Sequence, residues 1–221
     1  MKHCTISVRQ YIELLKQHGI WIAEQGIDGE VQLTGKPVTD SRQVAPGDTF
    51  VCIKGFNSGG HDYAKQAIAA GAKLVVYEHP LLEITHGIQV KDCRKAAALL
   101  SKLYYDNTTG KLTLIGITGT NGKTTTSMLI WQALTCLGHK TGWIGTLGYT
   151  MDGNIVATQN TTPDITELNG ILAEMADAGC SYVVMEVSSH ALALDRVYGL
   201  EFDYALFSNL SREHLDFHKD M

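Results

Sequence analysis

The sequence has 221 residues, of which 44% are hydrophobic and 19% are charged. A chain of this length can form one large domain or two modest ones, each with its own hydrophobic core. Its 18 lysine and arginine residues against 23 aspartate and glutamate residues give a net charge of -5, which provides no general attraction for nucleic acid. Any phosphate binding must therefore be local.

The cysteines and the hydropathy pattern indicate a soluble protein of a reducing compartment. The 5 cysteines are an odd number, lie far apart and form no Cys-x-x-Cys pair, so neither a disulfide framework nor a zinc site is indicated. No stretch approaches the roughly 18 apolar residues that a membrane-spanning helix requires. We expect a cytoplasmic protein without a membrane span, and a monomer.

Short apolar runs and helical patterns alternate over the first hundred residues. The segments from Thr49 to Ile53 and from Lys73 to Tyr77 have the composition of strands, and the segment from Tyr63 to Ala70 between them has a helical pattern. This alternation predicts a small α/β domain. The polar, turn-prone stretch from Tyr105 to Lys111 follows. We therefore expect one domain over residues 1–108 and a second over residues 109–221.

The second domain begins with an apolar strand from Leu112 to Thr118, followed by a glycine-rich loop. After the loop, apolar residues recur at the i, i+3, i+4 and i+7 positions of a helix that Gly138 would end. These residues are Ile130, Ala133, Leu134 and Leu137. The pattern predicts a buried amphipathic helix.

Further strands and helices alternate to the end of the chain. Residues Trp143 to Leu147 resemble a strand, and a second helical stripe ends before Gly179. The segment from Ser181 to Val187 is a continuous apolar run of the kind found in parallel strands covered on both faces, and the segment from Asp203 to Ser208 repeats it. The alternation predicts a doubly wound α/β domain, in which ligands bind beyond the carboxyl ends of the strands.

The glycine-rich loop has the composition of a phosphate site. Glycines let the backbone approach a phosphate, and the N–H groups of the turn and of the following helix point at the anion. Lys123 adds a positive charge, and the hydroxyl of Thr124 is a suitable Mg²⁺ ligand. The strict Walker pattern is missed because Ile117 occupies its first glycine position. An ordinary strand-to-helix turn is the alternative interpretation.

Several polar residues have both a structural and a functional interpretation. Glu186 lies near the carboxyl end of a predicted buried strand, where a carboxylate needs compensation by hydrogen bonds or by a cation held jointly with Thr124. His214 alone is equally well a surface or core histidine. Asp40 and Ser41 are typical of an Asx turn, and the residues from Thr162 to Asp164 are typical of a helix cap.

Four segments of the second domain together resemble the Mur ligase family, which joins amino acids to the peptidoglycan precursor. They are Ile117 to Thr126, Asn160 to Asp164, Met185 to Leu192 and Ser208 to His218. In the first domain, Thr39 to Arg42 and Pro46 to Val51 agree with the uridine-nucleotide domain of the MurE type. The resemblance covers nearly all of the chain.

The resemblance implies a reaction, its substrates and its cofactor. It implies ATP-dependent ligation of a diamino acid, meso-diaminopimelate or lysine, to UDP-MurNAc-L-Ala-D-Glu through an acyl phosphate, with Mg²⁺ as cofactor.

The resemblance also implies site residues. ATP would be bound by Gly119, Thr120, Asn121, Gly122, Lys123, Thr124 and Thr125. Catalytic roles fall on Lys123, Glu186 and His214, and metal ligation falls on Thr124, Glu186 and His214. The sugar-peptide substrate would contact Ser41, Phe56, Asn57, Ser58, Asn160, Thr161, Thr162, Ser188 and Arg196.

Some features depart from the family pattern. Leu194 stands where some relatives carry a glutamine that touches substrate. Full-length relatives continue past the equivalent of Met221 with a carbamoylated lysine and a C-terminal domain that selects the amino acid. We therefore expect the native enzyme to be a ligase and this chain alone to be inactive. A nucleotide-binding fragment without catalysis and a folylpolyglutamate-synthase-like ligase are the alternatives; Thr125, where such synthases commonly have serine, disfavours the latter.

Overall fold

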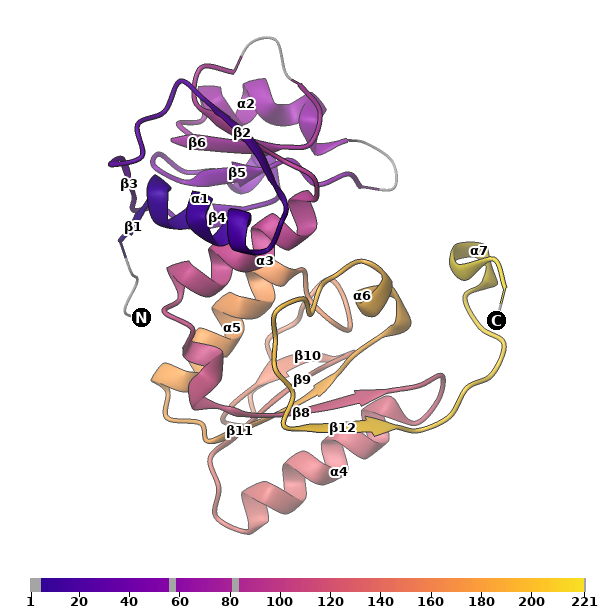
Figure 1. Cartoon of the computed structure of the whole chain (residues 1–221). Coiled ribbons are helices and arrows are strands. Elements are labelled where there is room, and N and C mark those ends of the chain that lie inside the picture. Colours follow the sequence, from indigo (N-terminus) through magenta and orange to yellow (C-terminus); the bar gives the residue numbers. More distant parts are fainter. Residues whose placement is uncertain (1–4, 56–58, 81–83, 221) are drawn as a thin grey trace. The chain divides into compact units, whose positions relative to one another are not determined.

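The computed structural model describes residues 5–55, 59–80 and 84–220 (Figure 1). The chain divides into two compact units, Met1–Asn107 and Thr108–Met221. The division falls within the turn-prone stretch and one residue before the boundary expected from the sequence. Among the described residues, no helix combines the length and the apolar character needed to cross a membrane.

The first unit is built on a five-stranded sheet with the order β2-β7-β6-β5-β4. The strands are β2 (Trp21–Gln25), β4 (Pro37–Val38), β5 (Thr49–Val51), β6 (Leu74–Tyr77) and β7 (Gly87–Val90). β2 runs antiparallel to β7, and the other neighbours are parallel. A separate antiparallel pair joins β1 (Ile6–Ser7) to β3 (Gln32–Leu33).

In the described part of this unit, the sheet is accompanied by the helices α1 (Val8–Gln17), α2 (Ala64–Ala69) and α3 (Cys93–Tyr104). Short 3-10 turns cover Ser41–Gln43 and Gly60–Tyr63. α1 begins at a capping box, because Ser7 and Gln10 each accept a hydrogen bond from the backbone N–H of the other. Asp92 caps α3 by accepting from the N–H groups of Arg94 and Lys95.

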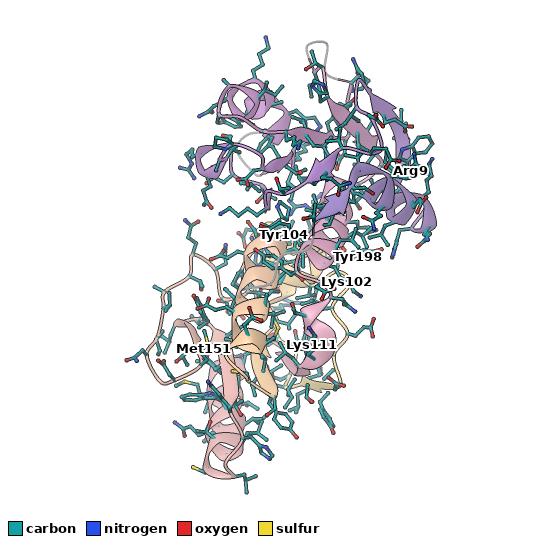
Figure 2. The ribbon with its side chains drawn as sticks, turned by 90° about the vertical axis from the view of Figure 1, so that its left-hand side faces the viewer. Arg9, Lys102, Tyr104, Lys111, Met151 and Tyr198 are labelled. Atoms are coloured by element: carbon teal, nitrogen blue, oxygen red, sulfur yellow. The ribbon has the colours of Figure 1, made fainter. Side chains whose placement is uncertain are left out.

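The core of the first unit forms on the faces of the sheet. α2 packs against a cluster of buried side chains from β5, β6 and their neighbours. Elsewhere α1 contacts α3, and the buried hydroxyl of Tyr11 donates to the carbonyl oxygen of Ala96 at 2.9 Å. Tyr104, labelled in Figure 2, is buried at the end of α3, and its ring meets that of Tyr105 edge on.

The second unit is built on a sheet with the order β10-β9-β11-β8-β12. The strands are β8 (Thr113–Thr118), β9 (Thr141–Gly145), β10 (Gly148–Thr150), β11 (Tyr182–Glu186) and β12 (Tyr204–Phe207). β9, β11, β8 and β12 are parallel neighbours, and β10 returns antiparallel along β9. The parallel strands therefore present their carboxyl ends at one edge.

Helices cover both faces of this sheet, which confirms the predicted α/β class (Figure 1). The helices are α4 (Lys123–Cys136), α5 (Ile165–Asp177), α6 (Ser189–Ala193) and α7 (Leu215–His218), and a 3-10 turn covers Thr108–Lys111. Leu114, Ile144 and Val183 pack with α5, whereas Ile115, Trp143 and Val184 pack with α4. Consecutive residues face opposite helices because side chains alternate along a strand. Met151, labelled in Figure 2, packs on the α5 side.

Two sequence expectations about burial in the second unit are wrong. α4 is amphipathic as expected, since Ile130 and Leu134 of the predicted stripe pack against the sheet, but it is not buried, and Leu137 follows the helix end with 75% of its surface exposed. β12 is parallel to β8 as expected, but all four of its residues are exposed. Both segments lie at the border of the unit, where an apolar sequence does not reveal whether anything covers it. The strand expected from Trp143 to Leu147 also starts earlier, at Thr141.

Candidate functional site

The glycine-rich loop joins the carboxyl end of β8 to the first turn of α4. Gly119 and Gly122 adopt φ angles of 129° and 84°, a region that other residues rarely occupy. A Cβ atom on Gly119 would also collide with the hydroxyl of Ser208 and the backbone of Asn209. The loop conformation therefore depends on glycine at both positions.

The start of α4 provides donors and positive charge at this loop. The first N–H groups of a helix have no acceptor within the helix, and the helix dipole makes this end positive. The Lys123 ammonium group donates to the carbonyl oxygens of Gly119 and Thr120 at 2.6 and 2.8 Å. The ammonium group is thus held against the loop, next to the free helix end. An anion such as a phosphate suits this arrangement.

The segment after β12 holds the other side of the loop. The side-chain amide of Asn209 accepts from the N–H of Asn121 at 3.0 Å and donates to its carbonyl oxygen at 3.0 Å. The backbone oxygen of Asn209 accepts from the N–H of Thr120 at 2.9 Å. Ser211 exchanges two further hydrogen bonds with Thr120. Sequence reasoning did not assign Asn209 a role, because no local pattern links residues 88 positions apart.

Glu186 lies at the carboxyl end of β11 and is completely buried. Its Oε2 accepts a hydrogen bond from the Thr124 hydroxyl at 2.9 Å. This contact brings together the two residues that the sequence singled out as a joint cation site. No lysine, arginine or histidine of the described residues forms an ion pair with Glu186. Hydroxyl and backbone N–H donors stabilise the carboxylate.

The donor atoms around Glu186 fit a small, hard cation. They are carboxylate and hydroxyl oxygens, which Mg²⁺ prefers, and Mg²⁺ binds through one or two carboxylates while phosphate oxygens complete its shell. Within residues 5–55, 59–80 and 84–220, no three His, Cys, Asp or Glu side chains gather as a metal cluster. The carboxylate and hydroxyl oxygens at Glu186 suit a cation whose remaining ligands come from a phosphate group.

Thr146 is a part of this site that sequence reasoning missed. It follows β9 directly, and its N–H donates to Glu186 Oε1 at 3.0 Å. Its hydroxyl lies 3.3 Å from Glu186 Oε2 and 3.2 Å from the hydroxyl of Thr161. A signal was available, since a polar residue at the end of a buried parallel strand lies at the ligand edge of the sheet.

Thr162 is buried, and its side chain bonds to the backbone and not to solvent. Its side chain is fully buried, its hydroxyl donates to the carbonyl oxygen of Glu186 at 2.9 Å, and it accepts from the N–H of Ser188 at 3.1 Å. Arg196 donates to the carbonyl oxygen of Thr162 at 3.0 Å. Its Nε lies 2.9 Å from Asp164, close enough for an ion pair although not aligned as a hydrogen bond. Asp164 precedes α5 but makes no side-chain cap, in contrast to the cap interpretation.

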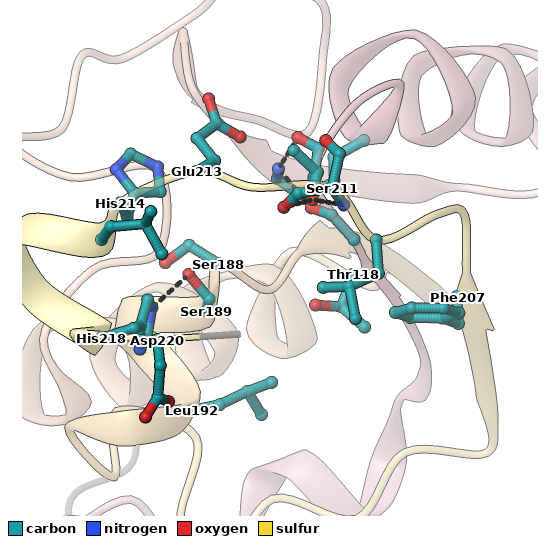
Figure 3. Close-up of a pocket in the computed structure, with 15 residues that line it drawn as sticks. Thr118, Ser188, Ser189, Leu192, Phe207, Ser211, Glu213, His214, His218 and Asp220 are labelled. Atoms are coloured by element: carbon teal, nitrogen blue, oxygen red, sulfur yellow. Dashed lines mark hydrogen bonds between the residues drawn. The ribbon is translucent and has the colours of Figure 1, made fainter.

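A cavity of about 540 Å³ lies beside the glycine-rich loop (Figure 3). Lys123, Ser188 and His214 line it, so the structure brings these three candidate residues to one space. The ring of His214 meets that of His190 at 4.7 Å between centroids. Partial burial, followed by the nearby charges of His214 and His218, lowers the pKa of His190. His214 makes no hydrogen bond to Thr124 or Glu186.

The candidate residues of the first unit are only partly described. Ser41 is buried at the start of a 3-10 turn, and its hydroxyl lies 3.3 Å from Gln66 Oε1. Asp40 accepts from the N–H of Arg42 at 3.0 Å, which is the Asx turn that the sequence left open. Phe56, Asn57 and Ser58 lie outside the described residues.

Comparison with known proteins finds Mur ligase domains in both units. Residues 117–221 match the Mur ligase middle domain, and residues 38–105 match the catalytic domain of the Mur ligase family. A Clostridium botulinum UDP-N-acetylmuramoyl-L-alanyl-D-glutamate--2,6-diaminopimelate ligase is 46% identical over 185 residues, which cover 81% of this chain and 38% of the relative. A Geobacillus thermodenitrificans ligase of the same name is 43% identical over 203 residues, covering 92% and 41%. The chain thus spans about two fifths of the length of the curated relatives it matches.

Solved structures resemble the chain as well. One ligase with the same name has a TM-score of 0.77 at 28% identity, covering 96% of this chain and 42% of that one. The MurF ligase of Thermotoga maritima, solved in complex with ADP, has a TM-score of 0.56 at 23% identity, covering 85% and 40%. The second likeness concerns the fold alone.

Proposed function

The chain belongs to the Mur ligase family, and from this premise we propose that it carries the ATP site and part of the substrate site of a MurE-type ligase. The reaction would add a diamino acid, diaminopimelate or lysine, to UDP-MurNAc-L-Ala-D-Glu. The names of the relatives favour diaminopimelate.

The proposed chemistry has two steps. The D-glutamate carboxylate forms a bond to the γ-phosphorus of ATP while the bond to the bridging oxygen breaks, which releases ADP and leaves an acyl phosphate. The amine of the diamino acid then attacks the acyl carbon, and inorganic phosphate leaves. In the first step the D-glutamate carboxylate meets the phosphates of ATP. All of these groups are anionic, so the protein must offset their repulsion. Lys123 and the N-terminus of α4 can supply this compensation.

The contact between Thr124 and Glu186 carries the proposal. A buried carboxylate 2.9 Å from the hydroxyl that follows the loop lysine is the oxygen pair that a phosphate-bound cation needs. We propose that Thr124 and Glu186 hold Mg²⁺. When bound, Mg²⁺ would neutralise phosphate charge and stabilise the transition state.

We propose roles for the remaining candidate residues from their positions in the structure. His214 is a candidate ligand for a second metal ion, supported by its place in the same cavity as Lys123. Ser188 lines this cavity too and is a candidate substrate contact, together with Asn160, Thr161 and Arg196. Thr162 would act by holding the segment from Glu186 to Ser188, since its side chain is buried.

We propose that the first unit binds the uridine nucleotide of the substrate. Ser41 and the segment of Phe56, Asn57 and Ser58 are the candidate contacts, and the family match over residues 38–105 supports them. The buried free thiols of Cys52, Cys93 and Cys180 support a reducing, cytoplasmic setting. Titrating the chain with UDP and with UDP-MurNAc-L-Ala-D-Glu tests this role, and a Ser41→Ala variant that binds both as tightly as wild type would count against Ser41.

Calorimetric titration with ATP tests the proposed function, because the proposed contacts to the phosphates and to Mg²⁺ all lie in this chain. Wild type should bind ATP more tightly with Mg²⁺ than in EDTA. Glu186→Gln should lose that gain and keep the weaker binding in EDTA. Glu174→Gln is the matched control, since Glu174 lies on α5 and contacts Tyr149 instead. No ATP binding by wild type, or an unchanged Mg²⁺ gain in Glu186→Gln, would refute the proposal.

A further inference from the structure

Thr146 contacts Glu186 of the proposed cation site and also Thr161. It follows β9, the parallel neighbour of β11, and Met185 pairs with Ile144 in that register. Gly145 and Glu186 are therefore the next residues of the two strands. The carboxylate of Glu186 lies directly over Gly145, because a Cβ there would collide with Oε1. This close approach puts the carboxylate within reach of both polar groups of Thr146.

Both oxygens of the Glu186 carboxylate contact Thr146. The backbone N–H donates to Oε1 at 3.0 Å, and the hydroxyl donates to Oε2 at 3.3 Å. Two contacts to different oxygens fix the rotation of the carboxylate plane. Oε2 is also the oxygen that Thr124 contacts at 2.9 Å, so this rotation decides how Oε2 and the Thr124 hydroxyl face a shared cation.

Thr161 holds the Thr146 hydroxyl from the other side. The two hydroxyl oxygens are 3.2 Å apart, and either can be the donor. Since the Thr146 proton is used toward Glu186, Thr161 donates to Thr146. The chain of hydrogen bonds therefore runs from Thr161 through Thr146 to Glu186 Oε2. Such a connected set orients its members more firmly than a single bond does.

We propose that Thr146 is a positioning residue whose hydroxyl orients the Glu186 carboxylate for the cation that Glu186 and Thr124 hold. This inference rests on the proposed function, and it adds a residue and a role to the same site. Groups that orient a metal ligand typically change metal affinity 10- to 100-fold when they are removed. The hydroxyl of Thr146 should therefore affect the Mg²⁺ dependence of ATP binding and not the binding of ATP without metal.

Two substitutions separate the hydroxyl from the rest of the residue. Thr146→Val keeps the shape and the backbone N–H but removes the hydroxyl, whereas Thr146→Ser keeps the hydroxyl. ATP affinity is measured in EDTA and over a series of free Mg²⁺ concentrations. We expect Thr146→Val to need about tenfold more Mg²⁺ for half of the affinity gain, with unchanged affinity in EDTA. Thr146→Ser should restore the wild-type Mg²⁺ dependence.

Thr135→Val is the matched control, because Thr135 lies on α4 and bonds to the carbonyl oxygen of Trp131. It should leave both affinities unchanged. A wild-type Mg²⁺ dependence in Thr146→Val would overturn the inference, and so would equal losses in EDTA and Mg²⁺ that serine does not restore. If wild type itself shows no Mg²⁺-dependent ATP binding, the proposed function fails, and this inference with it.

Discussion

Lys123 is the residue on which phosphate binding should depend most. Its ammonium group already lies at the loop, and charge-assisted hydrogen bonds contribute about 1.5–3 kcal/mol each. Lys123→Ala should therefore weaken ATP binding by roughly ten- to a hundredfold or abolish it, without unfolding the second unit. Calorimetry gives the affinity, and circular dichroism checks the fold. Lys111→Ala should behave like wild type, and unchanged affinity in Lys123→Ala would contradict the assignment.

Position 145 requires glycine, because the Glu186 carboxylate lies where a Cβ atom would be. An added methyl group would collide with Glu186 and with the ring of Trp143, both of which are buried. Overpacking of this kind typically costs about 1–3 kcal/mol. Gly145→Ala should lower the urea midpoint of the second unit and reduce the Mg²⁺ gain in ATP affinity.

Gly29→Ala is the control for Gly145→Ala, because an added Cβ there would lie 3.4 Å from its nearest neighbour on Arg9, an ordinary contact. It should leave the Mg²⁺ gain in ATP affinity intact. Equal effects of the two substitutions would show that the collision at Gly145 has no special consequence.

Individual residues were predictable from sequence where their chemistry is local. Gly119, Lys123 and Thr124 belong to a local pattern that predicts a phosphate site, and the structure places Gly119 in the turn after β8 and the other two in the first turn of α4. Thr162 was assigned to substrate contact, yet its burial depends on Glu186 and Ser188, which lie on another strand end. Thr146 was missed because the expected strand ran on to Leu147, whereas β9 ends at Gly145 and leaves Thr146 at the ligand edge of the sheet.

At the scale of elements, the link between the end of β12 and the glycine-rich loop should control nucleotide affinity. Asn209→Ala removes two hydrogen bonds to Asn121, each worth about 1 kcal/mol, and leaves the backbone bond to Thr120. We expect about tenfold weaker ATP binding both in EDTA and in Mg²⁺, because the whole loop is affected.

The expected result for Asn209→Ala differs from that for Thr146→Val, which should weaken ATP binding only when Mg²⁺ is present. Asn154→Ala is the control for Asn209→Ala, as Asn154 bonds to Asp152 in a surface turn. Wild-type ATP affinity in Asn209→Ala would show that the loop keeps its shape without this link.

The types and order of the elements could be predicted, whereas their burial at the border of a unit could not. Hydrophobic periodicity located β8, β11 and α5 closely, because each is covered by the part of the chain that the structure describes. β12 has the same apolar composition, but its four residues are exposed and belong to neither of the buried clusters that hold the other parallel strands. The apolar composition of a strand shows that its side chains can be buried, but the helices packed against the strand determine whether they are.

For the molecule as a whole, two histidines make stability depend on pH in the same direction. His61 Nε2 accepts from the N–H groups of Glu78 and His79, so the neutral ring is the form that the fold uses. Burial, and then the nearby His79, lowers the pKa of His61, and the pKa of His190 is lowered as well. The unfolded chain therefore binds protons more readily than the folded one.

The stabilisation from these histidines is fully present above a pH of about 6.5, the unfolded value, and is lost as the pH falls below it. Urea unfolding at a series of pH values between about 5 and 8 measures this loss. His61→Gln should reduce the slope for the first unit, because it removes a ring whose pKa the fold lowers. A flat stability profile through this range would exclude the linkage.

The bonds between Asn209 and the glycine-rich loop also have a consequence for synthesis. The loop leaves the ribosome 88 residues ahead of its partner. At about 5–20 residues per second, the nascent chain carries the loop for roughly 4–18 s before Asn209 exists. Contacts so distant along the chain form late in folding. A nascent chain stalled before residue 209 should therefore hold ATP poorly, and it would gain nucleotide affinity only once the segment that follows β12 has been made.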